Sequence, residues 1–209
     1  MPDVSGYPVR GVDVSHYEGA IDWGRVKAAG AAFAFLKATE GGDYVDDTFA
    51  ANWSSAAAAG MPRGAYHFYD FCATGAAQAD NFIRTVPFDD GALPPVIDLE
   101  QSNDCAKMPT KKAFLKQFDV FVRKIRAAYG RAPILYVNLG IYDSYLTEVG
   151  PAFPLWIADP SHASPVLPAG ARWAFWQYSW HGKVDGIGVE TDLDVFAGDA
   201  AALSALTRP

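Results

Sequence analysis

Short apolar runs alternate with longer amphipathic stretches along most of this chain. The apolar runs have strand length, and they predict strands at residues 9–14, 32–37, 64–69, 95–99, 134–137, 155–158, 174–178 and 193–196. The stretches between them have helical spacing, and several end at a glycine. They predict helices at residues 23–29, 47–59, 75–85, 110–129, 141–146 and 200–206. Strands therefore alternate with helices, most regularly over the first two thirds of the chain.

Strand–helix alternation favours a parallel sheet with helices outside it. Eight strands within 209 residues predict an α/β fold of the irregular, TIM-like (β/α) barrel type. The helices of the final third are short or missing, so we do not expect a regular eightfold barrel. No linker, low-complexity tract or tandem repeat is present, and we expect a single domain over residues 1–209 with its core at about residues 8–207.

Composition and charge narrow the class of protein. Half of the residues are apolar and 20% are charged, which excludes a disordered chain. A net charge of −7 without a Lys/Arg run makes nucleic acid and anionic membrane surfaces poor partners. No apolar run approaches the roughly 20 residues that cross a bilayer, so no membrane insertion is expected. No apolar heptad is evident, and we expect a monomer.

Polar and aromatic residues gather at the C-terminal ends of the predicted strands, where barrels and open parallel sheets bind ligands. These candidate site residues are Asp13, Tyr17, Lys37, Glu40, Tyr66, His67, Tyr69, Asp98, Glu100, Tyr136, Asn138, Trp156, Asp159, Trp176 and Gln177, with Asp192 and Asp194 on the last strand. Carboxylates with aromatic walls suit sugar hydrolysis, in which one acid protonates the leaving oxygen and another group stabilises an oxocarbenium-like centre. No Gly-rich phosphate loop and no Gly-x-Ser-x-Gly elbow is present.

Asp98 and Glu100 form the sharpest pair. They stand two residues apart on a strand, so both side chains point to one face. Two carboxylates held that close repel each other, and one should keep a proton toward neutral pH, as a general acid requires. An Asp-x-Glu sequence is also common where a strand end simply faces water. Asp13 has an alternative role too, as the cap of a turn.

His16 and His67 could join these acids in a metal site, but the spacing matches no zinc signature. Hydrogen-bonded histidines in a polar cleft wall are the simpler interpretation, and we expect no metal and no other cofactor. Cys72 and Cys105 are too few for a disulfide framework or a zinc site, and they could be bridged or free. Each lies a few residues beyond adjacent strand ends, so we favour a bridge at the rim of the cleft.

Several motifs together resemble the catalytic domain of glycoside hydrolase family 25, the Chalaropsis-type lysozymes. They are Gly11-Val12-Asp13-Val14-Ser15-His16-Tyr17, Ile21-Asp22-Trp23, Phe35-Leu36-Lys37-Ala38-Thr39-Glu40-Gly41, Asn52-Trp53, Gly64-Ala65-Tyr66-His67-Phe68, Pro94-Pro95-Val96-Ile97-Asp98-Leu99-Glu100, Trp156, Trp176-Gln177-Tyr178 and Asp192-Leu193-Asp194-Val195-Phe196. They follow the order of the family and span nearly the whole chain. Each is weak alone, and the set is highly specific.

The resemblance implies hydrolysis of the β-1,4 bond between N-acetylmuramic acid and N-acetylglucosamine in peptidoglycan. It implies that Glu100 is the general acid/base, and that Asp98 orients and stabilises the 2-acetamido group of the substrate or the charged intermediate. Members of the family are often proposed to use that acetamido group as the nucleophile, with net retention. Asp13 and Asp192 fall on the family's other two acidic positions. The family's late motif often reads Asp-x-Asn, whereas here its second acidic position is Asp194. No wall-binding domain is recognised in the sequence.

Two other functions remain open at this point. A peptidoglycan-binding or other glycan-binding protein could keep the barrel and lack the chemistry. A metal-dependent carbohydrate deacetylase could use the histidines. The resemblance implies an extracellular, periplasmic or cell-wall site of action, although Met1–Val4 does not begin a secretory signal.

Overall fold

A single sheet of nine strands organises the computed structural model, which describes residues 2–101, 105–167 and 171–207. The strands are β1 (Arg10–Val14), β2 (Phe33–Glu40), β3 (Tyr44–Val45), β4 (Arg63–Phe68), β5 (Val96–Leu99), β6 (Ile134–Val137), β7 (Leu155–Ala158), β8 (Trp173–Gly182) and β9 (Thr191–Phe196). Their order is β1-β9-β8-β7-β6-β5-β4-β2-β3, and β1 also pairs with β2. This additional pairing closes eight strands into a barrel, and β3 adds only a short hairpin to the edge of β2.

Strand β9 makes the barrel mixed. It runs antiparallel to both of its neighbours, β1 and β8, whereas the other neighbouring barrel strands are parallel. The prediction of an irregular TIM-like α/β barrel is confirmed, but the expectation of a wholly parallel sheet is wrong for this strand. A parallel neighbour needs a crossover connection, and no helix lies between β8 and β9.

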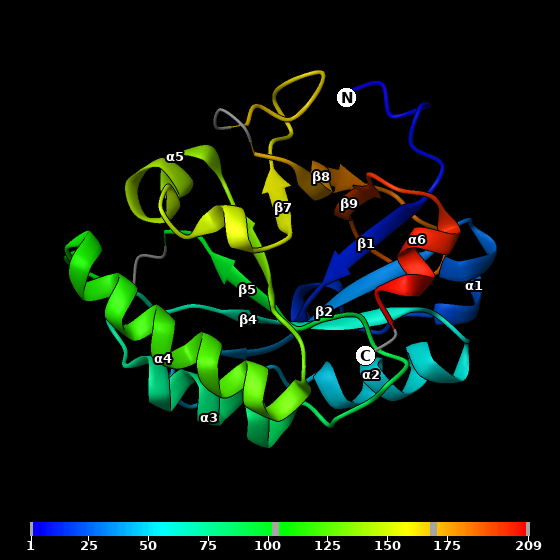
Figure 1. The fold of residues 1–209 in the computed structure, drawn as a ribbon. Helices are drawn as coiled ribbons and strands as arrows, with labels where there is room; N and C mark the ends of the chain where they lie inside the picture. The colour runs from blue at the N-terminus through cyan, green and yellow to red at the C-terminus, as the bar shows by residue number, and fades with distance from the viewer. Residues whose placement is uncertain (1, 102–104, 168–170, 208–209) are drawn as a thin grey trace.

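Helices cover the outside of the barrel, most of them in the first two thirds of the chain (Figure 1). They are α1 (Trp23–Ala28), α2 (Phe49–Ala58), α3 (Gly75–Thr85), α4 (Lys111–Tyr129), α5 (Leu139–Ile141) and α6 (Ala200–Ala205), with the short turns η1 (His16–Glu18), η2 (Tyr142–Leu146) and η3 (Gly150–Ala152). Helix α4 begins where the Thr110 hydroxyl accepts the N–H of Ala113, and it ends at Gly130, whose φ is 69°. Among the described residues, no helix covers the β7–β8 and β8–β9 connections.

Aromatic side chains fill the inside of the barrel. The ring of Phe35 stacks on Trp156 with 4.6 Å between ring centroids, and Phe175 packs against Phe35 edge-on. Glycine makes room for these rings, since a Cβ at Gly11 would lie 2.4 Å from the ring of Phe33. The interior is thus a packed floor, and polar side chains at the mouth rest on it.

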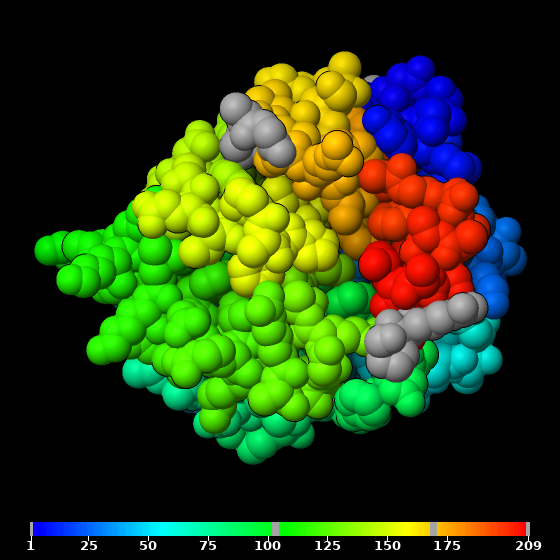
Figure 2. Space-filling view, viewed as in Figure 1, coloured from blue at the N-terminus to red at the C-terminus, as the bar shows by residue number. Residues whose placement is uncertain are grey.

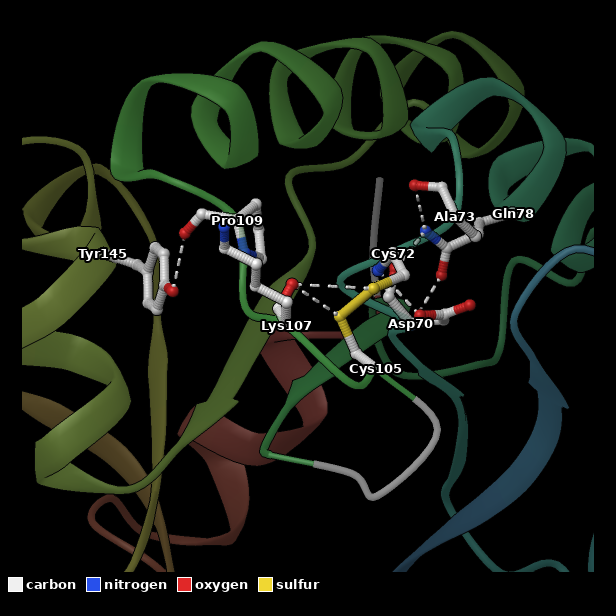
Figure 3. Close-up of a disulfide and its surroundings, with 8 residues drawn as sticks. All are labelled: Asp70, Cys72, Ala73, Gln78, Cys105, Lys107, Pro109 and Tyr145. Carbon is white, nitrogen blue, oxygen red and sulfur yellow. Dashed lines mark hydrogen bonds between the residues drawn. A yellow bond between two sulfur atoms is a disulfide. The ribbon is translucent and has the colours of Figure 1, made fainter.

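A disulfide joins Cys72, which follows β4, to Cys105, which follows β5 (Figure 3). The expected bridge is therefore present. Farther along the same segment, the hydroxyl of Tyr145 donates a hydrogen bond of 2.9 Å to the carbonyl oxygen of Pro109 (Figure 3). These two links hold residues 105–109, which lead into α4.

The N-terminal segment and helix α6 lie on the same side of the molecule (Figure 2). The N-terminal segment and α6 adjoin in the space-filling view, blue beside red (Figure 2). Beneath them, β1 and β9 are hydrogen-bonded neighbours. In the part of the chain that the structure describes, no helix is long and apolar enough to cross a membrane.

Candidate active site

A cavity of about 290 Å³ opens at the mouth of the barrel, above the aromatic floor. Ten of the residues expected at the site line it, namely Asp13, Tyr17, Lys37, Tyr66, Asp98, Glu100, Tyr136, Trp156, Gln177 and Asp192. Nine of them come from or follow the C-terminal ends of parallel strands. Asp192 comes from the start of β9, and it reaches the same mouth because that strand is antiparallel.

Asp98 and Glu100 lie at the end of β5 and both face this cavity. Asp98 is 7% exposed, and its Oδ1 atom has no hydrogen-bond donor among the described residues. Burial, and next the charge of Glu100, raise the pKa of Asp98 well above its usual value. Burial also raises the pKa of Glu100, although the charge of Lys37 opposes this. The pair therefore retains a proton more readily than two free carboxyl groups would.

Lys37 is the one cationic side chain among the described residues that line the cavity. It projects from β2, and its Nζ lies 2.6 Å from Oε2 of Glu40. Its ammonium group also stands 4.8 Å from the ring centroid of Phe68. One buried cation thus faces several carboxyl groups, and the cavity favours neutral or positively charged groups over anions.

Asp13 and Asp192 stand opposite each other across β1 and β9, and one amide joins them. The Nε2 atom of Gln177 donates to Oδ2 of Asp13 at 2.8 Å and to Oδ2 of Asp192 at 2.9 Å. Burial, and then the nearby charges of Glu18 and Glu100, raise the pKa of Asp192 to about 7. Burial and the neighbouring aspartates raise the pKa of Asp13 well above its usual value. Asp13 and Asp192 therefore also retain protons more readily than free carboxyl groups would.

The model of glycosyl hydrolases family 25 matches residues 12–187 of this chain. The chain belongs to family 25. Lysozyme M1 from Streptomyces globisporus is 37% identical over 217 residues, which cover 99% of this chain and 73% of that protein. The N,O-diacetylmuramidase of Chalaropsis sp is 33% identical, over 82% of this chain and 88% of that enzyme. The solved structure of a bacterial lysozyme from Streptomyces coelicolor matches with a TM-score of 0.91 and 36% identity, covering 98% of each chain.

The family membership confirms the resemblance that the motifs carry. The chain is a glycoside hydrolase of the lysozyme and N-acetylmuramidase type, and its substrate class is peptidoglycan. Its single barrel is the fold of the solved bacterial lysozyme.

Three residues expected at the site face away from it. His67 and Tyr69 lie on the outer side of β4 and just beyond it, against Phe121 of α4. Trp176 lies on the outer side of β8, where it packs against Tyr7. The reason is the two-residue period of a strand, because the neighbours that point inward are Tyr66, Phe68, Phe175 and Gln177.

The other four expected residues do not line the cavity. Asn138 caps α5 by accepting the N–H of Ile141, and Asp159 holds the turn that follows β7. Glu40 pairs with Lys37. Asp194 is buried in the barrel wall below Asp13 and Asp192, where its Oδ1 accepts the indole N–H of Trp156 at 2.8 Å.

Four lining residues were not expected from the sequence, namely Val14, Ser15, Glu18 and Phe68. The sequence contains a signal for the position of Glu18, because Ser15 and Glu18 have the spacing of a helix capping box. In the structure the N–H of Ser15 donates to Oε2 of Glu18 at 2.7 Å, which turns Glu18 back toward the mouth. Trp180, farther along β8, donates its indole N–H to Oε1 of Gln177 at 2.8 Å and remains half exposed.

The histidines do not join the acidic residues of the cavity. His67 lies between Thr39 and Gln78, with its Nδ1 2.7 Å from the Thr39 hydroxyl, and burial lowers its pKa to about 4. His16 pairs with Asp46 at 2.8 Å. Within the described residues, the one group with metal-ligand spacing contains Asp70, Cys72 and Cys105, whose sulfur atoms are bonded to each other. The deacetylase interpretation, which needs histidine ligands in the cavity, has no support in this arrangement.

Proposed function

We propose that this family 25 enzyme cleaves the β-1,4 bond between N-acetylmuramic acid and N-acetylglucosamine, with Glu100 as the general acid and base. The observation that carries this proposal is the pair of carboxyl groups at the end of β5. Both face the cavity, and burial raises the pKa of each. A proton-bearing carboxyl group at the edge of a sugar-sized cavity is what protonation of a glycosidic oxygen requires.

The reaction proceeds in two steps. Glu100 donates its proton to the leaving oxygen, while the 2-acetamido oxygen of the substrate attacks the anomeric carbon from the other face. A positively charged ring intermediate forms, and the carboxyl group of Asp98 orients and stabilises it. Glu100, now ionised, removes a proton from the incoming water, which opens the intermediate with net retention of configuration.

The surrounding charges favour this course. The intermediate is cationic, and the carboxyl oxygens of Asp13, Asp98 and Asp192, which line the cavity, are acceptors that face it even where a proton is shared among them. Lys37 is held by Glu40 and lowers the pKa of Glu100, which opposes the effect of burial. Glu100 is therefore kept closer to the range in which a group can both give and take a proton.

The site of action that we propose is outside the cytoplasm, at a cell wall. The Cys72–Cys105 disulfide is of the kind that persists in oxidising compartments. Peptidoglycan, the substrate class of the family, lies in the same compartments. A bacteriolytic or antimicrobial role is part of this proposal and rests on the same two facts.

Digestion of purified peptidoglycan tests the bond and the residue together. The released fragments are reduced with borohydride and weighed by mass spectrometry, and we expect reduced N-acetylmuramic acid ends from the wild type. The Glu100→Gln variant should lose at least about a thousandfold in kcat, because it removes the proton while keeping the shape of the side chain. The matched variant Glu148→Gln, which changes a side chain that is 70% exposed, should keep wild-type turnover.

Other outcomes would assign the chain differently. Reduced N-acetylglucosamine ends would make it a glucosaminidase. Turnover by Glu100→Gln close to that of the wild type would remove Glu100 as the proton donor. Tight retention on peptidoglycan with no fragments from several wall types would favour the non-catalytic glycan-binding protein.

A further inference from the structure

Asp194 is a fully buried carboxyl group for which the steps of hydrolysis give no task. It lies on β9, paired across the sheet with Gly11 of β1 on one side and with Gln177 of β8 on the other. Its Oδ1 accepts the indole N–H of Trp156, but its Oδ2 has no hydrogen-bond donor among the described residues. An ionised oxygen buried without a donor is costly, and a proton on this carboxyl group removes the cost.

The neighbour that can share such a proton is Asp13. The two carboxyl groups lie on the same inner face of adjacent strands, and the charge of Asp194 is, after burial, the next cause of the raised pKa of Asp13. Each already has one oxygen satisfied by a neutral donor, which is Trp156 Nε1 for Asp194 and Gln177 Nε2 for Asp13. Two carboxylates in contact repel, whereas a carboxylic acid and a carboxylate attract through a short, charge-assisted bond.

Gln177 fixes the other side of Asp13. Its Nε2 donates to Asp13 and Asp192, and its Oε1 accepts from Tyr136 Oη and Trp180 Nε1, each at 2.8 Å. The two donors and two acceptor positions of this amide are thereby used on protein groups. Gln177 can turn toward a ligand only by breaking these bonds, so it acts as a fixed support for Asp13 rather than as a flexible reader of sugar hydroxyls.

We propose that Asp13 and Asp194 hold a single proton between them, and that Asp194 and Gln177 are the positioning residues that aim Asp13 into the cavity. This inference deepens the proposed function, because it assigns Asp13 an orientation that matters for turnover. The pair carries one negative charge in place of two. Asp13 thus remains a hydrogen-bond acceptor at the mouth of the barrel. The proton shared with Asp194 and the side-chain amide of Gln177 hold it in place.

The groups around Asp194 determine whether turnover rises or falls with pH. The acidic groups facing it are Asp13 from β1 and Asp192 from its own strand, while β7 and β8 present the uncharged Trp156 and Gln177. Burial, and next the charge of Asp192, raise its pKa well above the usual value. When the pH rises far enough to remove the shared proton, two adjacent negative charges push Asp13 out of position. Turnover should therefore fall on the alkaline side.

Three variants and one control test the pair. Asp194→Leu removes the partner, and we expect kcat to fall about tenfold with KM changed less than about twofold, the scale of one lost hydrogen bond. Asp194→Asn supplies a permanent amide donor, and it should recover most of that loss and make the alkaline decline shallower, leaving the part that follows loss of the Glu100 proton. Asp13→Asn serves in the spectroscopic comparison only. Asp143→Asn, an exposed aspartate on η2, is the matched control and should leave the pH profile unchanged.

Infrared difference spectra give a readout that does not depend on turnover. The purified wild-type protein at neutral pH should show the carbonyl band of a protonated carboxyl group. Asp194→Asn and Asp13→Asn should each remove the same band, because the remaining partner then ionises. Loss of two separate bands, or of none, would overturn the shared proton.

Two further results would overturn the positioning role. One is an Asp194→Asn variant as slow as Asp194→Leu, and the other is an alkaline decline in Asp194→Asn that matches that of the wild type. If Asp194→Leu does not fold, the Asn variant and the spectra still decide the question. A wild type that releases no fragments would sink the proposed function instead, and the spectra would still report whether the two carboxyl groups share a proton.

Discussion

Asp98 and Glu100 stand two residues apart, yet their surroundings fit them for different tasks. Asp98 is enclosed, and both burial and the charge of Glu100 hold its pKa well above the usual range. Glu100 is less buried and lies near Lys37, so the rise in its pKa is opposed. A group that must release and recover a proton in each cycle needs a pKa near the working pH. Glu100 meets this condition better than Asp98.

Tyr17 lines the cavity and is also highly exposed to solvent. Its side chain is 78% exposed, its ring packs 4.1 Å from the ring of His16, and it lines the mouth. We predict that Tyr17→Ala raises KM for peptidoglycan fragments about fivefold with kcat nearly unchanged, because an aromatic face for the sugar is lost. Tyr17→Phe keeps the face and should behave like the wild type.

Steady-state kinetics on a soluble, cross-link-free glycan fragment measure this split. A fall in kcat with constant KM in Tyr17→Ala would mean that the ring shapes the transition state instead of binding the ground state. Equal losses in the Ala and Phe variants would assign the effect to the hydroxyl group.

The residues that gather at the mouth of the barrel could be predicted from the ends of the strands. Whether a given side chain points into the barrel could not be predicted from its residue type. Carboxyl groups such as Asp13 and Asp98 follow apolar runs and were found by that signal. His67 and Trp176 were expected at the site because they are polar or aromatic, and both lie one residue out of phase with the inward face. The period of two sorts the residues of one strand into two faces, but which face points inward on β4 and β8 follows from the register between strands, which the sequence does not give.

At the scale of elements, β9 decides how the site is completed. Its apolar spacing predicts a strand, but spacing carries no information about direction. The direction follows from the connection, since β8 extends to Gly182 and returns to Thr191 without a helix. Because β9 runs backwards, Asp192 at its start lies at the mouth and Asp194 lies one layer deeper. A parallel strand would have reversed these depths.

The disulfide links the segments that follow β4 and β5, and its contribution to stability can be measured. Cys72 and Cys105 are 33 residues apart in sequence, and closing such a loop stabilises a fold by about 3–4 kcal/mol through the entropy of the unfolded chain. We predict that the double variant Cys72→Ser, Cys105→Ser lowers Tm by about 10 °C. Differential scanning calorimetry measures the shift.

Reduction provides the matched control for that variant. A reducing agent should lower the Tm of the wild type by a similar amount and leave the double serine variant unchanged. Turnover at 25 °C should survive in both, because the sulfur atoms do not line the cavity. An unchanged Tm in the double variant would show that the unfolded chain is already restricted without the bridge.

At the scale of the whole molecule, several of the acidic side chains point into the barrel and not to the surface. The net charge is −7, and Asp13, Asp98, Glu100, Asp192 and Asp194 form one cluster at and below the mouth. Burial raises the pKa of every one of them. The folded protein therefore binds protons that the unfolded chain releases.

This proton uptake sets how stability depends on pH. A group whose pKa is higher in the folded state stabilises the fold at low pH, and that contribution declines as the pH rises from the unfolded pKa through the folded one. For Asp192 this interval runs from the usual pKa of 3.8 to about 7, and for the other four it extends upward from the usual carboxyl range. His67 acts in the opposite direction between 6.5 and about 4, but as one group against five.

We therefore predict that the enzyme is more stable at about pH 5 than at about pH 8, with Tm falling by roughly 4–8 °C over that range for a loss of about 2 kcal/mol. Calorimetry in buffers of equal ionic strength measures the slope. Asp192→Asn should reduce the slope, since it removes a titrating group whose interval lies largely inside this range, whereas the exposed Asp143→Asn should not. A Tm that rises from pH 5 to pH 8 would mean that the five carboxyl groups are ionised in the folded state, and it would contradict the shared proton of Asp13 and Asp194 as well.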